Sequence, residues 1–386
     1  MLVTQIYSIM NDISDEVLGS RELLQEDLTN ITDFGTQLFG ATSVDNYVRS
    51  LVDRIGKVVF VDRKYSGSVP SVYMDSFEFG AVVEKIQADT PEAVENESWE
   101  LQDGQSYDPN VFYKPTVSAK FFSGMSTFEV DMSFTERQVK SSFVSASQLN
   151  AFMTMIHNAI DRSLTVKIDA LIMRTINSMT AQTVRDCFGA STVYTTAGNT
   201  RCVNLLKLYN DEIDPATDLT VDKALSNPEF IRFASLKMGL YVDRMSKLST
   251  LFNIGGKDRF TSREYLHTVM LTDFKQAANS YLQSDTFHEQ FTALPEAETV
   301  PYWQGSGTDY AFGKISKINV KHGSDITEFD GILAVMFDRD ALGVSNLDRR
   351  VTTNYNPKAE FYNNFYKFDA GYFNDANENF VVFYIA

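Results

Sequence analysis

The fold is decided by one segment near the middle of the chain, SQLNAFMTMIHNAIDRSLTVKIDALIMRTINSM, residues 147–179. Apolar residues recur along it at the three- and four-residue spacing of a helix, and it contains neither proline nor glycine. These apolar positions are Leu149, Phe152, Met153, Ile156, Ile160, Leu164, Ile168, Leu171, Ile172 and Ile176. At 1.5 Å per residue the segment predicts a helix about 50 Å long, which Ser145 or Ser147 can cap and which acts as a strut across a domain.

Strands are predicted before this helix. Val58–Val61, Phe77–Ile86 and Thr116–Phe134 are rich in β-branched and aromatic residues, and apolar residues alternate with polar ones from Phe128 to Phe134. Between the last two strands, Ile86–Tyr113 carries seven acids and no lysine or arginine. We therefore expect a long hairpin with an extended, solvated tip, or alternatively an acidic contact for a basic neighbour.

The remainder of the chain mixes helices and strands. Asn227-Pro228-Glu229 predicts a helix start, and the pattern continues to Phe252 before Gly255-Gly256. A helix is expected over Asp273–Leu282. The expected strands are Leu266–Leu271, Lys314–Val320, Gly331–Phe337, Val351–Tyr355, Phe361–Tyr372 and Phe380–Ile385. Because strands and helices do not alternate regularly, the fold class is α+β rather than a doubly wound sheet.

Composition excludes several classes of protein. The 386 residues are 44% hydrophobic and carry a net charge of −17, with 20 acids and 7 bases in residues 1–110. This balance argues against a surface that wraps nucleic acid. The longest apolar runs, Ile332–Phe337 and Phe380–Ala386, are too short to span a membrane, and residues 1–16 lack the features of a signal peptide. Two cysteines cannot build a disulfide framework.

Templates for catalysis and metal binding do not fit the sequence. Neither GxGxxG nor GxxxxGK[ST] occurs, and Gly305-Ser306-Gly307 predicts a flexible turn. His288-Glu289 begins like a zinc-protease helix, but Thr292 stands where the second histidine is needed. Asp338-Arg339-Asp340 resembles a metal-binding motif, although nearby arginines favour a salt-bridged turn.

The other residues that could carry chemistry are isolated. Four histidines are scattered along the chain, at positions 157, 267, 288 and 322, and a structural role is expected for His157. Cys187 and Cys202 have neither CxxC spacing nor a nearby histidine, so inert thiols are expected. We predict no catalytic, cofactor-binding or metal-binding residue, and no enzymatic activity.

The order of the elements resembles the major capsid proteins of tailed bacteriophages, which share the Hong Kong 97-type capsid fold. The similarity is greatest to those of phages of low-GC Gram-positive bacteria. Five segments carry it over nearly the whole chain, namely residues 77–99, 120–134, 148–165, 280–307 and 331–386.

The resemblance implies a division of the chain. Residues 1–55 would be an N-terminal arm, and residues 56–140 the E-loop, the long hairpin of the fold, with its flanking strands. Residues 141–200 would be the peripheral domain with its spine helix, residues 201–330 the axial domain, and residues 331–386 the C-terminal strands that close the peripheral domain.

The resemblance also implies partners and a location. The chain would form hexamers and pentamers of an icosahedral head that encloses double-stranded DNA, in a virion assembled in the cytoplasm of the bacterial host. Its partners would be itself, the portal protein and, because the arm begins at Met1, a separate scaffolding protein; cement proteins are a further candidate. Sequence-specific nucleic-acid binding and membrane binding are not expected.

Two alternatives and one covalent possibility stay open at this point. The chain could be a cytosolic acidic hydrolase without a known motif, or a minor head or cement protein of a virion. Some similar capsid proteins join neighbours by a Lys–Asn isopeptide bond, and Lys85 and Lys120 with Asn354 or Asn356 are residues of the required types.

Overall fold

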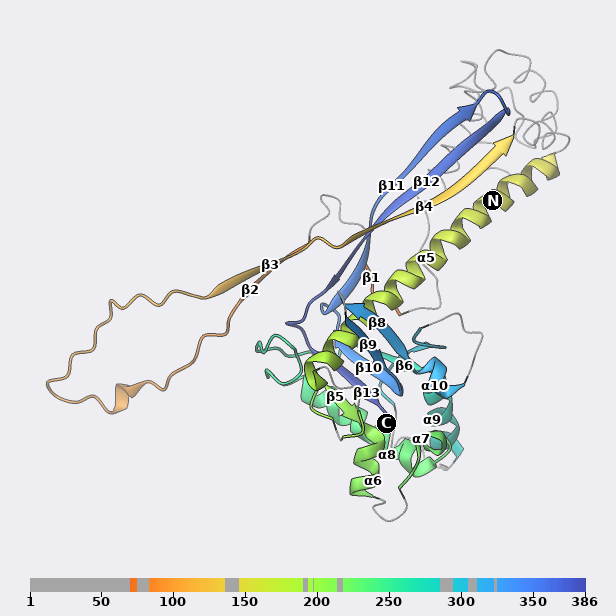
Figure 1. The fold of residues 1–386 in the computed structure, drawn as a ribbon. Coiled ribbons are helices and arrows are strands. Elements are labelled where there is room, and N and C mark those ends of the chain that lie inside the picture. The colour runs from red at the N-terminus through yellow and green to blue at the C-terminus, as the bar shows by residue number, and fades with distance from the viewer. Residues whose placement is uncertain are drawn as a thin grey trace.

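The computed structural model describes residues 70–74, 83–135, 146–189, 194–196, 198–213, 218–284, 294–304, 311–322 and 325–386. The predicted arm, the strand at 58–61, the zinc-protease-like segment at 288–292 and the Gly-Ser-Gly tripeptide lie outside these residues. Figure 1 shows three parts, which are a globular part, an elongated sheet and a hairpin that projects away from both.

The predicted strut is a single helix, α5 (Ala146–Phe188), of 43 residues. It runs nine residues past the predicted end because Ala181 and Val184 are buried and no helix breaker precedes Gly189. Gly189 has a φ of +64°, and its N–H donates to the carbonyl of Arg185 at 2.7 Å, which is the usual way to end a helix.

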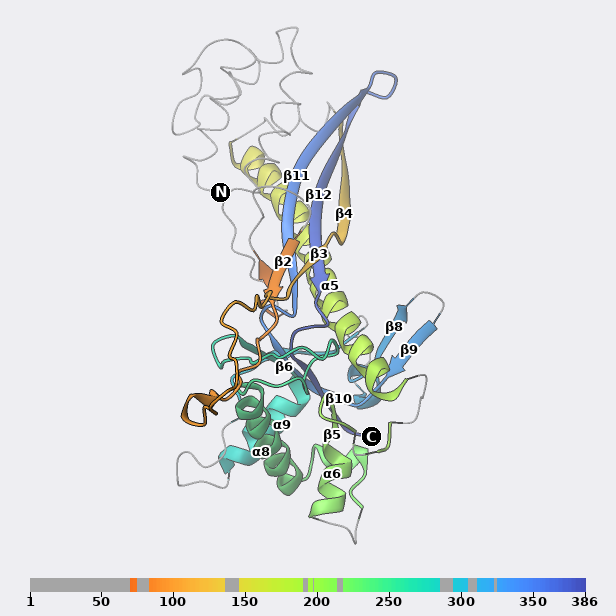
Figure 2. The same ribbon diagram turned by 90° about the vertical axis from the view of Figure 1, so that its left-hand side faces the viewer.

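The helix α5 connects the elongated sheet to the globular part (Figures 1 and 2). It contacts strands of both sheets, which confirms its predicted role as a domain-spanning strut. The predicted apolar positions from the middle of the helix onward are buried, at Ile160, Leu164, Ile168, Leu171, Ile172 and Ile176.

The elongated sheet has the strand order β1-β11-β12-β4. Its strands are β1 (Tyr73–Met74), β11 (Leu342–Asn356), β12 (Phe361–Asn374) and β4 (Met125–Thr135). The strand β11 begins nine residues before the predicted Val351, since its antiparallel register with β12 continues from Asn356 opposite Phe361 to Leu342 opposite Asn374. In β4, alternate residues are exposed and half-buried as predicted.

The globular part contains a mixed five-stranded sheet of order β5-β13-β10-β6-β7. Its strands are β5 (Cys202–Asn204), β13 (Phe380–Tyr384), β10 (Ile332–Asp338), β6 (Leu266–Leu271) and β7 (Glu298–Val300). Every residue of β10 and β13 is buried. These two central strands therefore form the middle of the core, with apolar residues on both faces.

Helices cover both faces of this sheet. They are α5, α6 (Leu205–Glu212), α7 (Val221–Ala224), α8 (Pro228–Met245), α9 (Thr272–Ser284) and α10 (Phe312–Ile315). Phe383 of β13 contacts Tyr241 of α8, with ring centroids 5.1 Å apart, whereas the next residue, Tyr384, contacts Phe188 of α5 at 6.2 Å. Consecutive strand residues point to opposite faces, so α8 and α5 lie on opposite sides of the sheet.

Two further element boundaries differ from the prediction. Asn227 caps α8 as expected, but the helix ends at Met245 rather than Phe252, because the carbonyl of Met245 accepts from the N–H of Thr261 at 2.8 Å. The start of the strand predicted at Lys314–Val320 is instead the short helix α10, and the strand is β8 (Ile318–His322), paired with β9 (Asp325–Phe329).

The observed mixture of helices and sheets confirms the α+β prediction. Among the helices that the structure describes, none combines the length and apolar character needed to cross a membrane.

Candidate functional site: a projecting acidic hairpin

The projecting hairpin is formed by β2 (Val83–Ala88) and β3 (Val117–Phe122). The strands are antiparallel, with Val83 opposite Phe122 and Ala88 opposite Val117, which confirms the predicted pairing for this part of the two segments. The rest of the predicted segment 116–134 does not extend the hairpin, because it forms the separate strand β4, which pairs with β12. The N–H of Asp89 donates to the carbonyl of Thr116 at 2.9 Å and closes the ladder. Residues 90–115, here called the hairpin tip, extend beyond this last bond (Figure 1).

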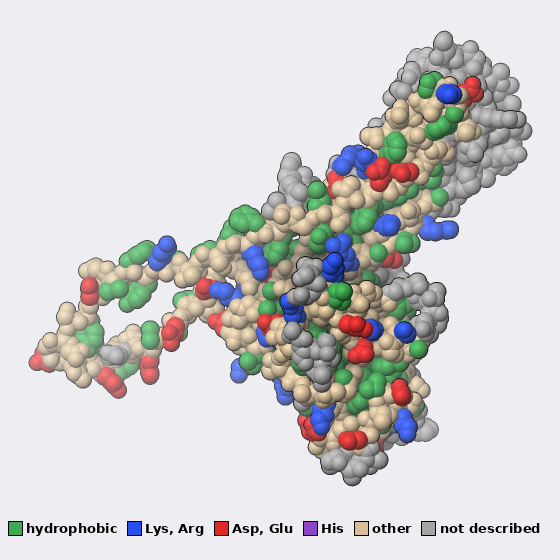
Figure 3. Space-filling view, in the orientation of Figure 1, with side chains coloured by type: hydrophobic (Ala, Val, Ile, Leu, Met, Phe, Trp, Pro, Cys, Tyr) green, Lys and Arg blue, Asp and Glu red, His purple; other side chains and the backbone are tan. Residues whose placement is uncertain are grey.

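The hairpin tip exposes large apolar side chains together with carboxylates. Its most exposed apolar residues are Val94, Trp99, Phe112 and Tyr113, each at least 83% exposed. Its exposed acids are Glu92, Glu95, Glu100, Asp103 and Asp108. Figure 3 shows both kinds of side chain along the tip. Large apolar groups gathered in water mark a surface that binds another molecule, and the acids give that surface a negative charge.

Polar contacts along one face of β2 hold the root of the hairpin to the globular part. Lys85 and Gln87 are half-buried, whereas Ile86 between them is exposed, so the two polar side chains point to the same side. Lys85 Nζ lies 3.4 Å from Asp375 Oδ2, and Gln87 Nε2 donates to Glu378 Oε1 at 3.0 Å.

Both strands of the hairpin contribute to this cluster. Lys120 stands directly opposite Lys85 in the β2–β3 ladder, and its Nζ lies 2.8 Å from Asp375 Oδ1. One step further out, Lys257 Nζ lies 2.8 Å from Asp89 Oδ1. The direction of the hairpin is therefore set by contacts between its two strands and two loops that are remote in sequence, one at 375–378 and one containing Lys257.

The pKa values of the two central carboxylates of the cluster, Asp375 and Glu378, are shifted in opposite directions. Burial alone would raise the pKa of Asp375, but hydrogen bonds from Lys120 and from the N–H of Asn377, with the charges of both lysines, outweigh it and lower that pKa. Burial raises the pKa of Glu378, and Arg259, at 3.2 Å, offsets only part of that effect. Asp375, whose side chain is fully buried, is therefore the anionic centre of the root.

The structure brings the two cysteines together, which the sequence did not predict. A hydrogen bond with Cys202 is the main cause that lowers the pKa of Cys187 to about 7, and Asn199 and Arg201 act in the same direction. Burial raises the pKa of the Cys202 thiol. Both thiols are free, and the contact joins the end of α5 to β5.

The Asp338-Arg339-Asp340 segment, which resembles a metal-binding motif, forms a turn. Asp338 begins a turn, and its carboxylate accepts from Thr261 Oγ1 at 2.7 Å and from the N–H of Asp340 at 2.9 Å. The turn agrees with the prediction. The salt bridge of the nearby Arg350, at 2.6 Å, is made with Asp369 of β12 rather than with an acid of the turn.

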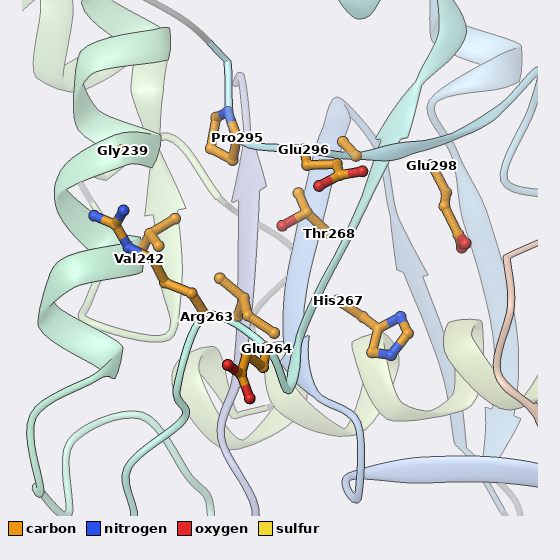
Figure 4. A pocket seen from close by; sticks show the side chains of 11 residues that line it. Gly239, Val242, Arg263, Glu264, His267, Thr268, Pro295, Glu296 and Glu298 are labelled. Atoms are coloured by element: carbon orange, nitrogen blue, oxygen red, sulfur yellow. The ribbon is translucent and has the colours of Figure 1, made fainter.

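A pocket of about 650 Å³ lies between α8, β6 and the segment before β7, and His267 lines it, stacked on Phe337. Figure 4 shows Arg263, Glu264 and Glu298 spread around this pocket without converging on one point. Within the described residues, no three His, Cys, Asp or Glu side chains are grouped to hold a metal ion. The charged side chains of this pocket therefore lie at separate points of its wall.

The residues considered for a covalent cross-link lie at separate places in one chain. Lys85 and Lys120 are both held at the hairpin root by Asp375. Asn354 and Asn356 lie at the distant end of β11, where Asn356 Oδ1 accepts from the N–H of Lys358 at 3.0 Å. Such a bond would have to join different chains.

The sequence did not reveal Asp375, Glu378 or Arg259 as partners of the hairpin. The alternation of polar residues at 85, 87 and 89 was the only local signal, because the partners lie at least 168 residues away along the chain.

The known proteins to which the chain is similar come from phages. The family model of the Phi29-like phage major capsid protein matches residues 6–384. No curated protein sequence is significantly similar to the chain.

Solved structures that match the chain also come from phages. A chain of the Staphylococcus phage Andhra capsid is 10% identical with a TM-score of 0.46, and the match covers 84% of this chain and 86% of that one. A chain of the structure of the head fiber and inner core protein of bacteriophage P68 is 9% identical with a TM-score of 0.45, covering 85% and 86%. A chain of the cyanophage P-SCSP1u capsid is 9% identical with a TM-score of 0.42, covering 86% and 94%.

Proposed function

The chain belongs to the Phi29-like phage major capsid protein family, and on that premise we propose that it assembles through hexamers and pentamers into the icosahedral head that encloses double-stranded DNA. Its role in the virion is structural. The Hong Kong 97-type fold expected from the sequence agrees with this family and with the α+β architecture.

The projecting hairpin is the observation that best supports assembly. Its tip leaves Trp99, Phe112 and Tyr113 in water and makes its own hydrogen bonds locally, as between the N–H of Asn110 and Asp108 Oδ1. A segment that buries little against its own chain must gain burial from a neighbour. Repeated around five- and six-fold rings, even a modest contact between subunits becomes stable.

The division of the chain expected from the sequence is part of this proposal. Residues 1–55 act as the arm, 56–140 as the E-loop with its strands, 141–200 as the peripheral domain with the spine helix, 201–330 as the axial domain and 331–386 as the closing strands. The hairpin of β2 and β3 supports the second assignment, and α5 supports the third.

Further partners follow from the same role. We propose that assembly takes place in the cytoplasm of the bacterial host with a separate scaffolding protein, that the shell incorporates a portal protein, and that cement proteins are optional partners. The net charge of −17 favours a shell that holds DNA by closure rather than by sequence-specific contacts. We propose no enzymatic activity for the chain.

Sedimentation velocity of the purified chain, alone and co-expressed with its scaffolding protein, tests this function, with negative-stain microscopy of the fast fraction. We expect rings or closed shells of uniform diameter. A stable monomer or dimer under all these conditions would overturn the proposal and favour the alternative of an acidic hydrolase or a minor head protein.

A further inference from the structure

The two tryptophans of the chain have opposite surroundings. Trp303 is 1% exposed, whereas Trp99, on the hairpin tip, is 96% exposed. An indole combines a large apolar surface with a single N–H donor, and tryptophan is enriched among the residues that dominate binding between proteins. Trp99 therefore has the properties of an anchor that requires an apolar cavity containing a hydrogen-bond acceptor.

A cavity with apolar walls lies beside α5. It has a volume of about 780 Å³ and is bounded by α5, the segment 300–304 and β8. Met173, Val300, Tyr302 and Val320 supply apolar surface to its walls. This volume is large enough for an aromatic side chain and its neighbours.

Two residues that line the cavity carry buried acceptors that find no partner among the described residues. Asn177 is 95% buried, and its Nδ2 donates to the carbonyl of Trp303 at 2.7 Å, which fixes the orientation of the amide. In the described part of the chain, Asn177 Oδ1 has no hydrogen-bond partner, and neither has Asp169 Oδ1, which lines the same cavity. A buried acceptor without a donor is unfavourable, so a ligand that brings an N–H would be stabilised here.

The wall around Trp303 is held in place by its own hydrogen bonds. Trp303 Nε1 donates to the carbonyl of Ile332 at 2.9 Å, and its backbone N–H donates to the carbonyl of Ile315 at 2.9 Å. Gln304 Nε2 donates to the carbonyl of Asn319 at 3.0 Å. The cavity is thus formed before anything binds, which lowers the entropy lost on binding.

Charges around the cavity complement those around Trp99. Arg174 and Lys321 line the cavity and are exposed, and they outnumber its one acid, Asp169. On the tip, exposed Glu95 and Glu100 flank Trp99. Opposite charges at the rim of a contact fix its register.

We propose that Trp99 of one copy fills this cavity on a second copy of the chain, where its indole N–H donates to Asn177 Oδ1 and where Glu95 and Glu100 face Arg174 and Lys321. The inference rests on the proposed function and names the place on the neighbouring subunit that receives the hairpin tip.

A disulfide trap tests the contact directly. Ser98, next to Trp99, and Ala170, on the cavity wall, are both exposed. Assembled particles of the double variant Ser98→Cys/Ala170→Cys are oxidised with diamide and run on non-reducing gels. We expect a ladder of linked chains that reducing agent removes. Each single variant serves as a control, which also accounts for the native Cys187 and Cys202.

Charge exchange across the contact provides a second measurement. Lys321→Glu and Glu100→Lys should each raise the concentration needed for assembly by about 3-fold or more, because each puts like charges together. The double variant should return it toward the original value. Lys247→Glu, an exposed lysine away from the cavity, is the matched control and should have little effect.

The outcomes separate this inference from the proposed function. Particles that form without the 98–170 ladder, or charge variants without rescue, would overturn the contact and leave the capsid assignment intact. If neither rings nor shells form from the unaltered chain under any condition, the proposed function fails, and this inference fails with it.

Discussion

Asp375 is the residue on which the direction of the hairpin depends. Its buried carboxylate receives one lysine from each strand of the hairpin, Lys85 and Lys120. The ammonium of Lys85 also lies 5.2 Å from the centre of the Phe373 ring. Because a buried charge is tolerated only when it is paired, each of these groups requires the others.

Replacing Asp375 by Asn should therefore destabilise the subunit. The amide keeps the shape but removes the charge that both lysines require, and we expect a loss of about 2 kcal/mol, since part of the cluster is screened by water. Urea unfolding at neutral pH measures it. Asp131→Asn, at an exposed position of β4, is the control and should unfold at the unchanged midpoint. Equal midpoints for all three proteins would contradict the role given to Asp375.

The same pair of proteins should differ in their dependence on pH. The folded-state pKa of Asp375 lies below the usual 3.8, so its contribution is complete above the unfolded-state pKa and is lost as the pH falls through the folded-state pKa. The stability gap between the original chain and Asp375→Asn should be constant from about pH 7 to pH 5 and should close below about pH 4. Urea midpoints at three pH values measure the gap; a gap that widens in acid would reverse the assignment.

Gly331 is a second residue whose identity matters for the stability of the fold, because there is no room for a Cβ atom at this position. Its φ is +76°, and an added Cβ would lie 1.9 Å from the carbonyl oxygen of Ile385. Gly331→Ala should cost about 1–3 kcal/mol, because the backbone conformation is unfavourable for alanine and Ile385 must move. Gly313→Ala, which meets no atom within 4 Å, is the matched control. Thermal unfolding should separate the two variants, and similar melting temperatures would count against this reading.

Residues with local signals were predictable, and residues with remote partners were not. The cap at Asn227 could be read from three adjacent residues, and its Oδ1 indeed accepts from the N–H groups of Glu229 and Phe230. By contrast, Lys120 and Asp375 are 255 residues apart, and nothing near either one indicates the other. The contact of Cys187 with Cys202 escaped prediction for the same reason.

At the scale of elements, the periodicity of the sequence predicted which helices and strands exist better than it predicted where they end. The spacing of apolar residues predicted α5, and the two β-rich segments around an acidic stretch predicted the hairpin of β2 and β3. The predicted end of α8 was wrong because the N–H of Thr261 donates a hydrogen bond to the carbonyl of Met245. The local sequence does not indicate this tertiary contact. The cavity beside α5 was not predicted, since it forms only when three remote segments meet.

Removing the hairpin tip should separate folding from assembly. Replacing residues 91–114 by Asn-Gly leaves both strands of the hairpin and their root contacts in place, and Asn-Gly favours a tight turn between strands. We expect an unchanged melting temperature by circular dichroism and no rings or shells by sedimentation. Normal shells from this variant would contradict the assembly role of the tip.

At the scale of the whole molecule, the uneven charge matters as much as the shape. Acids exceed bases by 13 in residues 1–110, so the part of the chain that includes the hairpin tip carries most of the net charge of −17. Like-charged subunits repel at long range, and association then depends on the local pairing of opposite charges. Specific contacts are favoured over random aggregation as a result.

The arm proposed for residues 1–55 is tested by deletion of residues 1–50. We expect a folded, soluble subunit with an intact core, because the core that the described residues form is built from Val72 onward. We also expect that it no longer assembles. Circular dichroism and sedimentation velocity check the two expectations, and normal assembly would show that the arm assignment is wrong.

The hairpin is a lever fixed at one end. Trp99, near the far end, is fourteen positions along the chain from Lys85 at the root, and an extended chain of that length spans at most about 46 Å. A tilt of about 5° at the root would then sweep the far end through about 4 Å, close to the spacing between neighbouring strands. A small change in the ionic contacts around Asp375 would thus be amplified into a displacement of several ångströms at Trp99. In the assembly that we propose, such a displacement would let one amino-acid sequence occupy both five- and six-membered rings.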